Sequence, residues 1–120
     1  MNWKRMFIMV IAFLLLSVIT AEAEEKFGVQ VYGGAKFDAA TSKNVSEFTS
    51  ANAACYRTND SVAKVAEFYK KQPRMKYTGG EKVAAALTNG QVDVTIQNPW
   101  MDTKTGKMMT DTLITIVKQE

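Results

Sequence analysis

Residues 53–69 constrain the fold of this chain more than any other stretch, because they join a short strand directly to an amphipathic helix. Apolar residues recur in the helical part at the spacing i, i+3, i+4 and i+7, which places them on one stripe: Val62, Val65, Ala66 and Tyr69. Residues 53–58 are too few for a helix and include Tyr and Thr, so we predict a strand there. An apolar stripe must be covered, and the stretch therefore predicts a helix packed on a sheet.

The limits of this helix follow from Asp60 and Pro73. The Asp60 carboxylate suits an N-cap, because it accepts hydrogen bonds from free amides of the first turn and its charge suits the positive end of the helix dipole. Pro73 ends the helix, because the residue before a proline avoids the α-helical region. We therefore predict one main helix from Ser61 to Gln72.

Patterns elsewhere in the chain predict the rest of an α+β fold. Residues 110–117 are a β-branched run with apolar side chains on both faces, which indicates a central strand. Residues 38–52 are rich in Ala, Ser, Thr and Asn, so we expect a loop with at most one helical turn, and residues 81–87 are ambiguous between a strand and a helical turn. The predicted strands are 27–32, 53–58, 75–78, 91–97 and 110–117. They predict an antiparallel sheet of four or five strands with one main helix packed on one face.

The first 23 residues have the pattern of a cleavable signal peptide. Lys4 and Arg5 give a basic start, and an uncharged apolar run follows from Met6 to Ala21. Ala21 and Ala23 supply the small residues that a signal peptidase requires. We therefore expect residues 1–23 to be removed, residues 24–120 to form a single domain, and the protein to be periplasmic or extracellular. The alternative is an uncleaved membrane tether, although the run is short for a permanent span.

Composition argues against several kinds of active site. The chain has no histidine, which removes the commonest general base and the commonest transition-metal ligand. Cys55 is the only cysteine, so no internal disulfide can form. We expect Cys55 to be buried as a small apolar side chain, the alternatives being an intermolecular disulfide or a catalytic thiol. We predict a protein that is not an enzyme and that uses no metal or other cofactor.

A small serine acyl-transfer enzyme is the distant alternative. It rests on three short motifs: Ser61-Val62-Ala63-Lys64, Lys104-Thr105-Gly106 and Ser50-Ala51-Asn52. In penicillin-interacting enzymes, a lysine one helical turn after the serine lowers the cost of deprotonating it. Here the Ser-x-Asn motif comes first, which reverses the usual order, and the chain is far too short for that fold. The simpler interpretation is that Ser61 helps to start the helix.

An apolar cluster flanks the last predicted turn. Trp100 and Met101 precede a polar loop, and Met108 and Met109 follow it. Core packing would explain these residues, but tryptophan is enriched where partners bind and methionine repacks against varied surfaces. We hypothesise that part of the cluster, including Trp100, is exposed and contacts an unknown protein or a hydrophobic ligand. The leading functional prediction is thus an exported, non-enzymatic binding module.

A basic cluster gives the second functional prediction. Lys70, Lys71, Arg74 and Lys76 gather around the end of the predicted helix. They would complement the helix dipole as a solvated face, or they would bind anionic envelope polymers or lipid headgroups. Only Tyr77 offers a stacking ring nearby, so we expect no nucleic acid partner. Apart from an uncleaved tether, such weak electrostatic contact is the one membrane association that we expect.

The chain resembles a group of small exported bacterial proteins. The resemblance rests on the turn Val31-Tyr32-Gly33-Gly34-Ala35, on the helix start Tyr56-Arg57-Thr58-Asn59-Asp60-Ser61 with Val65, and on the pair Phe68-Tyr69. Gly33 stands where the group usually has proline. These motifs are a turn, a cap and an apolar stripe, so the resemblance implies a bacterial envelope or extracellular setting rather than an activity.

Overall fold

The structure is a computed structural model that describes residues 24–119. The predicted signal peptide, residues 1–23, lies outside the described residues. Two helices are seen, α2 (Ala39–Thr49) and α3 (Val62–Lys70). The strands are β1 (Glu25–Lys26), β2 (Val29–Gln30), β3 (Lys36–Phe37), β4 (Asn52–Thr58), β5 (Lys76–Glu81), β6 (Ala84–Thr88), β7 (Val92–Gln97), β8 (Trp100–Met101), β9 (Met108–Met109) and β10 (Thr112–Lys118).

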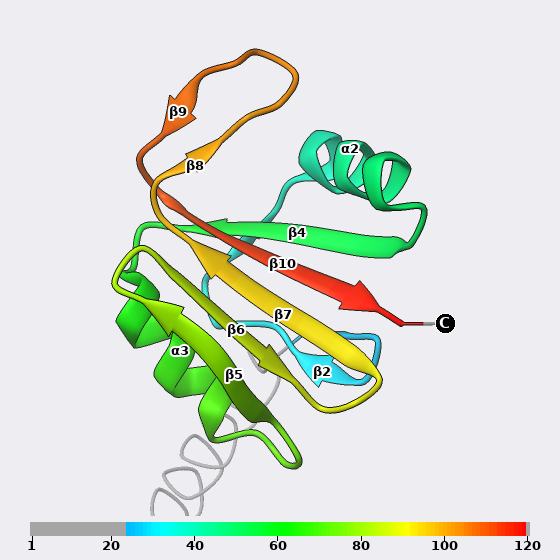
Figure 1. Cartoon of the computed structure of the whole chain (residues 1–120), viewed down its shortest axis with the longest axis vertical. Helices are drawn as coiled ribbons and strands as arrows, with labels where there is room; N and C mark the ends of the chain where they lie inside the picture. The colour runs from blue at the N-terminus through cyan, green and yellow to red at the C-terminus, as the bar shows by residue number, and fades with distance from the viewer. Residues whose placement is uncertain (1–23, 120) are drawn as a thin grey trace, which may run out of the picture.

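A six-stranded antiparallel sheet with the order β3-β4-β10-β7-β6-β5 forms the centre of the domain (Figure 1). The α+β class with a large antiparallel sheet is therefore confirmed, whereas the predicted four or five strands and single helix are too few. Strand β10 pairs with β4 on one side and β7 on the other. Leu113 and Ile114, on its opposite faces, are both buried, so the predicted central position is confirmed.

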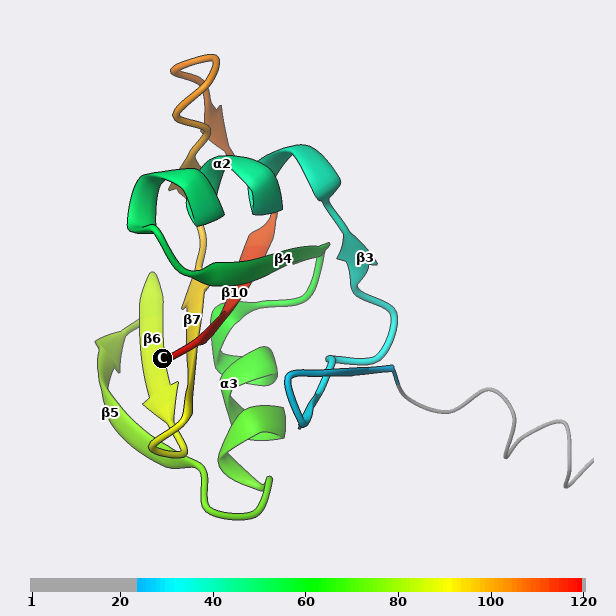
Figure 2. The same ribbon diagram turned by 90° about the vertical axis from the view of Figure 1, so that its right-hand side faces the viewer.

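Helix α3 packs on one face of the sheet, together with the β1–β2 hairpin (Figures 1 and 2). The predicted apolar stripe of α3 is confirmed, because all four of its residues are buried. They pack against the side chains that β4, β10, β7 and β6 point to this face. This layer is the main hydrophobic core.

The cap and the limits of α3 differ from the prediction. Ser61 is the N-cap, and its hydroxyl accepts a hydrogen bond from the Lys64 amide at 3.2 Å. Asp60 lies one residue too early for this role, and its carboxylate instead accepts a hydrogen bond from the Tyr32 hydroxyl at 2.5 Å. The helix ends at Lys70, before the predicted limit at Gln72.

The prediction of a loop over residues 38–52 is wrong, because α2 occupies most of this segment. Helix α2 lies along the outer edge of β4 and binds it through hydroxyl groups (Figure 2). The Ser42 hydroxyl accepts a hydrogen bond from the Cys55 amide at 2.7 Å, and the Ser46 hydroxyl accepts one from the Ala53 amide at 3.1 Å. Serines four residues apart face the same way on a helix, so α2 satisfies a strand edge rather than burying an apolar stripe.

Three further segments refine the sequence-based expectations. The predicted strand over residues 27–32 is confirmed only at Val29–Gln30, because the chain turns at Phe27 and Gly28 to form the β1–β2 hairpin. The ambiguous residues 81–87 mostly belong to strand β6. The β8–β9 hairpin continues beyond the end of the sheet, near α2 (Figure 1). No helix within the described residues is long and apolar enough to cross a membrane.

Candidate functional site: a groove between α2 and the β8–β9 hairpin

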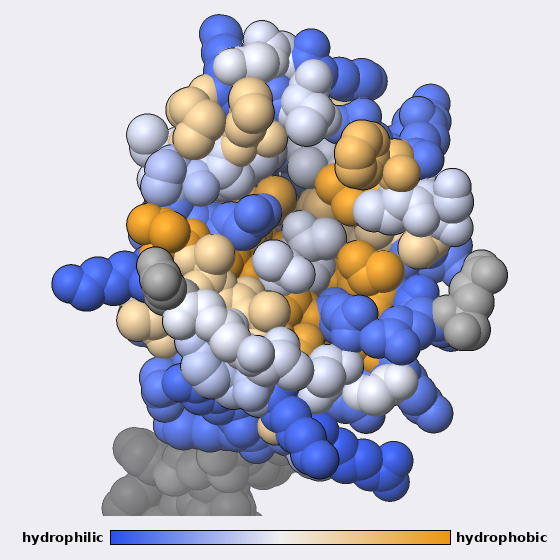
Figure 3. Space-filling model, viewed as in Figure 1, coloured by the Kyte–Doolittle hydropathy of each residue, from blue (hydrophilic) through white to orange (hydrophobic). Residues whose placement is uncertain are grey.

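A groove of about 450 Å³ lies between α2, the β8–β9 hairpin and the face of the sheet opposite α3. It exists because α2 binds the edge of β4, which leaves the face of β10 and β7 only partly covered. Figure 3 looks onto this face, where hydrophobic and weakly polar surface occupies the middle and hydrophilic surface lies mostly at the rim. The Asn44 side-chain amide on α2 donates a hydrogen bond to the Thr103 hydroxyl in the hairpin loop, which joins the two walls.

The lining of this groove mixes apolar side chains with hydroxyls and amides. The apolar members are Val45, Trp100, Met101, Leu113 and Val117. The polar members are Thr41, Asn44, Thr49, Thr95, Gln97, Asp102, Thr103 and Thr115. Asp102 is the only ionisable residue among them. Such a surface suits a ligand that offers both apolar area and hydrogen-bonding groups.

The structure divides the predicted Trp–Met cluster into exposed and buried members. Met101 and Met108 pair across the hairpin, and each is 57% exposed. Met109 is half-buried against a small core that contains Cys55 and Leu113. The expectation that Trp100 is exposed is wrong. Its side chain is only 4% exposed, and its indole N–H donates to the Asp111 carboxylate at 3.0 Å.

Cys55 is fully buried, as predicted. Its sulfur lies 3.7 Å from the Thr115 hydroxyl, beneath the groove floor. Burial raises the pKa of the Cys55 thiol, which keeps it protonated and unreactive. Cys55 therefore contributes packing to the site rather than nucleophilic chemistry.

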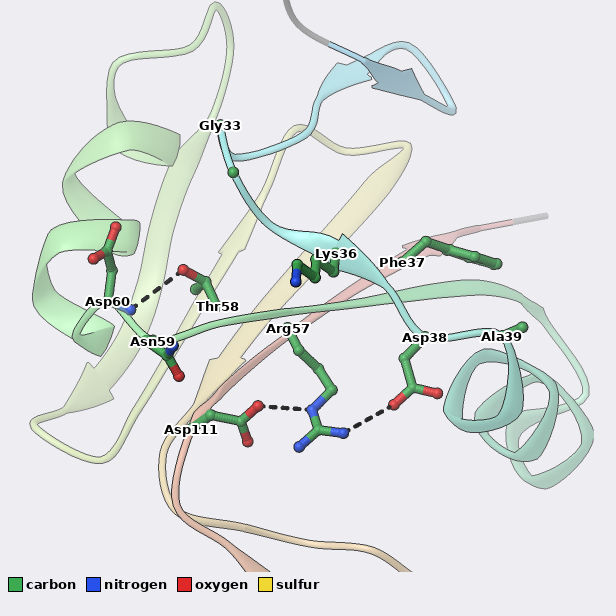
Figure 4. A pocket seen from close by; sticks show the side chains of 11 residues that line it. Gly33, Lys36, Phe37, Asp38, Ala39, Arg57, Thr58, Asn59, Asp60 and Asp111 are labelled. Carbon is green, nitrogen blue, oxygen red and sulfur yellow. Dashed lines mark hydrogen bonds and ion pairs between the residues drawn. The ribbon is translucent and has the colours of Figure 1, made fainter.

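Arg57 on β4 connects both walls of the groove (Figure 4). Its Nε donates to the Asp111 carboxylate at 2.7 Å, and its Nη1 lies 3.5 Å from the Asp38 carboxylate. Its guanidinium also lies 5.2 Å from the centroid of the Trp100 ring. Because Asp38 is the N-cap of α2 and Asp111 holds Trp100, this one cation fixes the helix relative to the hairpin.

The pKa values of this network follow from its contacts. The hydrogen bond from Arg57 to Asp111, together with the negative charges of Asp111 and Asp38, raises the pKa of Arg57, although burial alone would lower it. Burial would raise the pKa of Asp38, but hydrogen bonds from Thr41 and the Arg57 cation outweigh it and lower that pKa. Both groups therefore stay charged across the neutral range, and the network is a permanent tie rather than a proton-transfer site.

A second hollow of about 620 Å³ opens beside this network, at the end of β3 (Figure 4). Lys36, opposite Arg57 in the β3–β4 pair, lines it together with three carboxylates, Asp38, Asp60 and Asp111. Each carboxylate already has a hydrogen-bond partner within the protein. No group of three or more potential metal ligands occurs in residues 24–119. This hollow is larger than the groove, but most of its charged groups are engaged with one another.

The predicted basic cluster is divided among different surroundings. The Lys70 ammonium lies 3.4 Å from Glu67 and 4.5 Å from the centroid of the Tyr77 ring. Lys71 and Arg74 are exposed in the turn that follows α3. Lys76 begins β5, where alternation directs its side chain to the face opposite that of Tyr77. Lys76 therefore faces away from Lys70, and Lys71 and Arg74 lie in the turn between α3 and β5.

The three motifs of the acyl-transfer alternative lie on different elements. Ser61 caps α3, and Lys64 has its ammonium 3.8 Å from the Asp60 carboxylate. Residues 104–106 belong to the β8–β9 loop, and Ser50 follows the end of α2 (Figure 1). The Ser61 hydroxyl accepts a hydrogen bond from the Lys64 amide in this cap, and the Lys64 ammonium lies near Asp60.

The groove floor could have been found only in part from the sequence. The alternation of residues 91–97 does place Thr95 and Gln97 on the solvent-facing side of a strand. The α2 wall, with Val45 and Asn44, was missed because the segment has no apolar stripe. Asp111, which holds Trp100 in place, has no local sequence signal for that role.

Three comparisons with known proteins gave no relative from which a function could be transferred. No protein-family model matches the chain, and no curated protein and no solved structure matches it either.

Proposed function

We propose that this protein is an exported, non-enzymatic binding module of the bacterial envelope, which holds an apolar partner segment or ligand in the groove between α2 and the β8–β9 hairpin. The observation that carries the proposal is the groove itself, with its apolar side chains, the exposed Met101 that lines it and the exposed Met108 that pairs with Met101 in the hairpin. Exposed thioether side chains repack at little cost against varied partners. The Arg57 network supports the same proposal, because it holds the two walls in place before a ligand arrives.

The proposed export rests on the sequence of residues 1–23, with its basic start, apolar run and small residues before position 24. Mass spectrometry of protein recovered from the envelope or medium should give a chain that starts at Glu24. Recovery of a chain that still begins at Met1 would replace export with a membrane tether.

The groove is tested with the neutral dye Nile red, whose fluorescence rises on apolar surfaces. Thr95→Tyr places a ring on the groove floor, at a half-buried strand position where tyrosine is well tolerated. We expect the folded wild type to enhance the dye fluorescence and the variant to lose most of this effect. Thr110→Tyr, at an exposed position outside the groove lining, is the matched control and should behave as wild type. Equal dye binding by all three proteins would remove the groove as the site.

Contact with anionic polymers or lipid headgroups is the second candidate, and the exposed Lys71 and Arg74 favour it. It predicts retention on vesicles that contain phosphatidylglycerol, lost when salt is raised from 50 mM to 500 mM because screening weakens exposed charges. Lys71→Gln combined with Arg74→Gln should abolish this retention and leave Nile red binding unchanged. Retention on vesicles that persists both at 500 mM salt and in the double variant would exclude this second role.

A further inference from the structure

We infer that the natural occupant of the groove is an extended polypeptide segment that carries apolar side chains and at least one basic residue. This inference rests on the proposed binding function and names its partner. Three observations support it: the length of the hollow surface, its hydrogen-bonding groups and its charge.

The groove continues across the sheet. Thr95 lines both the groove and a neighbouring hollow of about 310 Å³ over β7, β6 and β5. Thr95 pairs with Thr115 on β10 and with Ala86 on β6, so small side chains form the floor across three strands. The result is an elongated trough rather than a closed cavity, and a long ligand would fill it.

The hydrogen-bonding groups distinguish a polypeptide from an alkyl chain. The Thr95 hydroxyl and the Gln97 amide lie among the apolar side chains of the trough. The Thr78 and Thr88 hydroxyls already donate to backbone carbonyls, so they keep only their acceptor lone pairs for a ligand. An alkyl chain would strip water from these groups and give no hydrogen bond in return, which costs free energy for each group covered. A polypeptide backbone offers a donor and an acceptor at nearly every residue, so it can replace the lost water.

The charges that line the trough select the side chains of the segment. Asp93 and Asp102 are its ionisable residues, one in each of the two hollows. Asp93 accepts a hydrogen bond from the Gln119 side-chain amide at 2.7 Å, a neutral partner that leaves its charge in place. Lys76 is on the trough side of β5, opposite Thr88, and Lys104 and Lys107 are in the β8–β9 loop, but none of the three lines either hollow. A basic residue in the bound segment would meet a carboxylate, whereas an acidic residue would be repelled.

The segment would lie on the face of the sheet, because the edges are poor templates for strand addition. On one side, the short edge strand β3 pairs with one end of β4, and serine hydroxyls of α2 bond the rest of the outer edge of β4. At the other edge, β5 carries a bulge between Tyr77 and Gly79, and the Tyr77 hydroxyl donates to the Gly80 carbonyl at 2.9 Å. Bulges and occupied edge groups oppose the addition of another strand.

Fluorescence anisotropy of dye-labelled peptides tests the inference on the full chain. The probes are two ten-residue peptides of alternating valine and threonine that differ only in one central lysine or glutamate. We expect the lysine peptide to bind roughly two to five times more tightly, as for an exposed ion pair. Asp93→Asn combined with Asp102→Asn should remove this preference. Glu67→Gln combined with Glu47→Gln, which removes the same charge outside the trough, should preserve it.

The outcomes separate this inference from the proposed function. Dodecyltrimethylammonium, added below its micelle concentration, should fail to displace the lysine peptide, and Thr95→Tyr should weaken peptide binding at least tenfold. If the alkyl cation displaces Nile red from the groove while neither peptide binds, the polypeptide partner is overturned and the groove is kept as a binding site. Equal affinity for both peptides would overturn the charge selection. If neither peptide, alkyl cation nor Nile red binds, both proposals fail.

Discussion

Helices α3 and α2 belong to the same sheet but are attached to it by opposite chemistry. Helix α3 buries a stripe of apolar side chains against the sheet face, and Val65 and Tyr69 in that stripe are fully buried. Helix α2 offers Ser42 and Ser46 to the backbone edge of β4. An apolar stripe closes a sheet face, whereas a hydroxyl row closes only an edge. The difference explains why one face of this protein is a core and the other contains a groove.

The same difference predicts which substitutions affect the stability of the fold and which affect ligand binding. The core beneath α3 excludes water over most of one sheet face. On the α2 side, the buried cluster within residues 24–119 is small, with Cys55, Trp100 and Leu113, and the groove lies above it. We therefore expect substitutions on the α3 side to change the free energy of unfolding and substitutions in the groove to change binding.

The largest effect is expected at Tyr69 on α3. Tyr69→Ala should lower the free energy of unfolding by roughly 3 kcal/mol, because it leaves a large cavity in the core. Tyr69→Phe keeps the ring but removes the acceptor of the Tyr32 amide, so it should cost about 1 kcal/mol. Urea denaturation measures both values. Equal losses for the two variants would show that the ring is not packed as described.

The next effect tests whether α2 is attached through hydroxyls. Ser42→Ala leaves the buried Cys55 amide without its partner and should cost about 2 kcal/mol in the same urea assay. Lys43→Ala, at an exposed position on the same helix, is the control and should change stability by less than about 0.5 kcal/mol. A negligible loss in Ser42→Ala would remove the contrast between the two helices.

The N-cap of α3 gives a smaller and more local effect. Ser61→Ala should cost about 1 kcal/mol, because the Lys64 amide at the start of α3 loses its acceptor. Ser50→Ala, beyond the last residue of α2, serves as the control because its side chain caps no helix start. Matching unfolding curves for Ser61→Ala and the wild type would mean that another group caps α3.

Asp38 makes the stability of the α2 attachment depend on pH. Its pKa in the folded state is below the ordinary value, so its contribution is complete at neutral pH and is lost as the pH falls through the folded-state pKa. Asp38→Asn preserves a capping side chain but removes the charge facing Arg57. The gap in stability between wild type and variant should be a few tenths to about 1 kcal/mol at pH 7 and should narrow toward pH 2. A stability difference between wild type and variant that stays constant from pH 7 to pH 2 would exclude the ion pair as its cause.

Sequence patterns predicted the α3 side well because its packing is periodic and local. Val62, Val65 and Tyr69 recur at helical spacing, and the alternation of residues 91–97 matches the burial of β7. The α2 side depends on contacts that leave no period in the sequence. Ser42 meets Cys55, and Trp100 meets Asp111, only after the sheet has formed. The methionines on either side of a polar loop indicated the hairpin. The burial of Trp100 could not be predicted, because it depends on a contact with Asp111 that exists only in the folded protein.

The central claim is that ligands bind on the α2 side and leave the α3 side unchanged. Two-dimensional amide NMR of the ¹⁵N-labelled protein, titrated with the lysine-bearing peptide, tests it most directly. We predict that amide signals of Asn44, Thr95 and Thr115 shift progressively while those of α3 stay in place. Shifts confined to α3 and the turn with Lys71 and Arg74, with Thr95 and Thr115 unaffected, would contradict the claim.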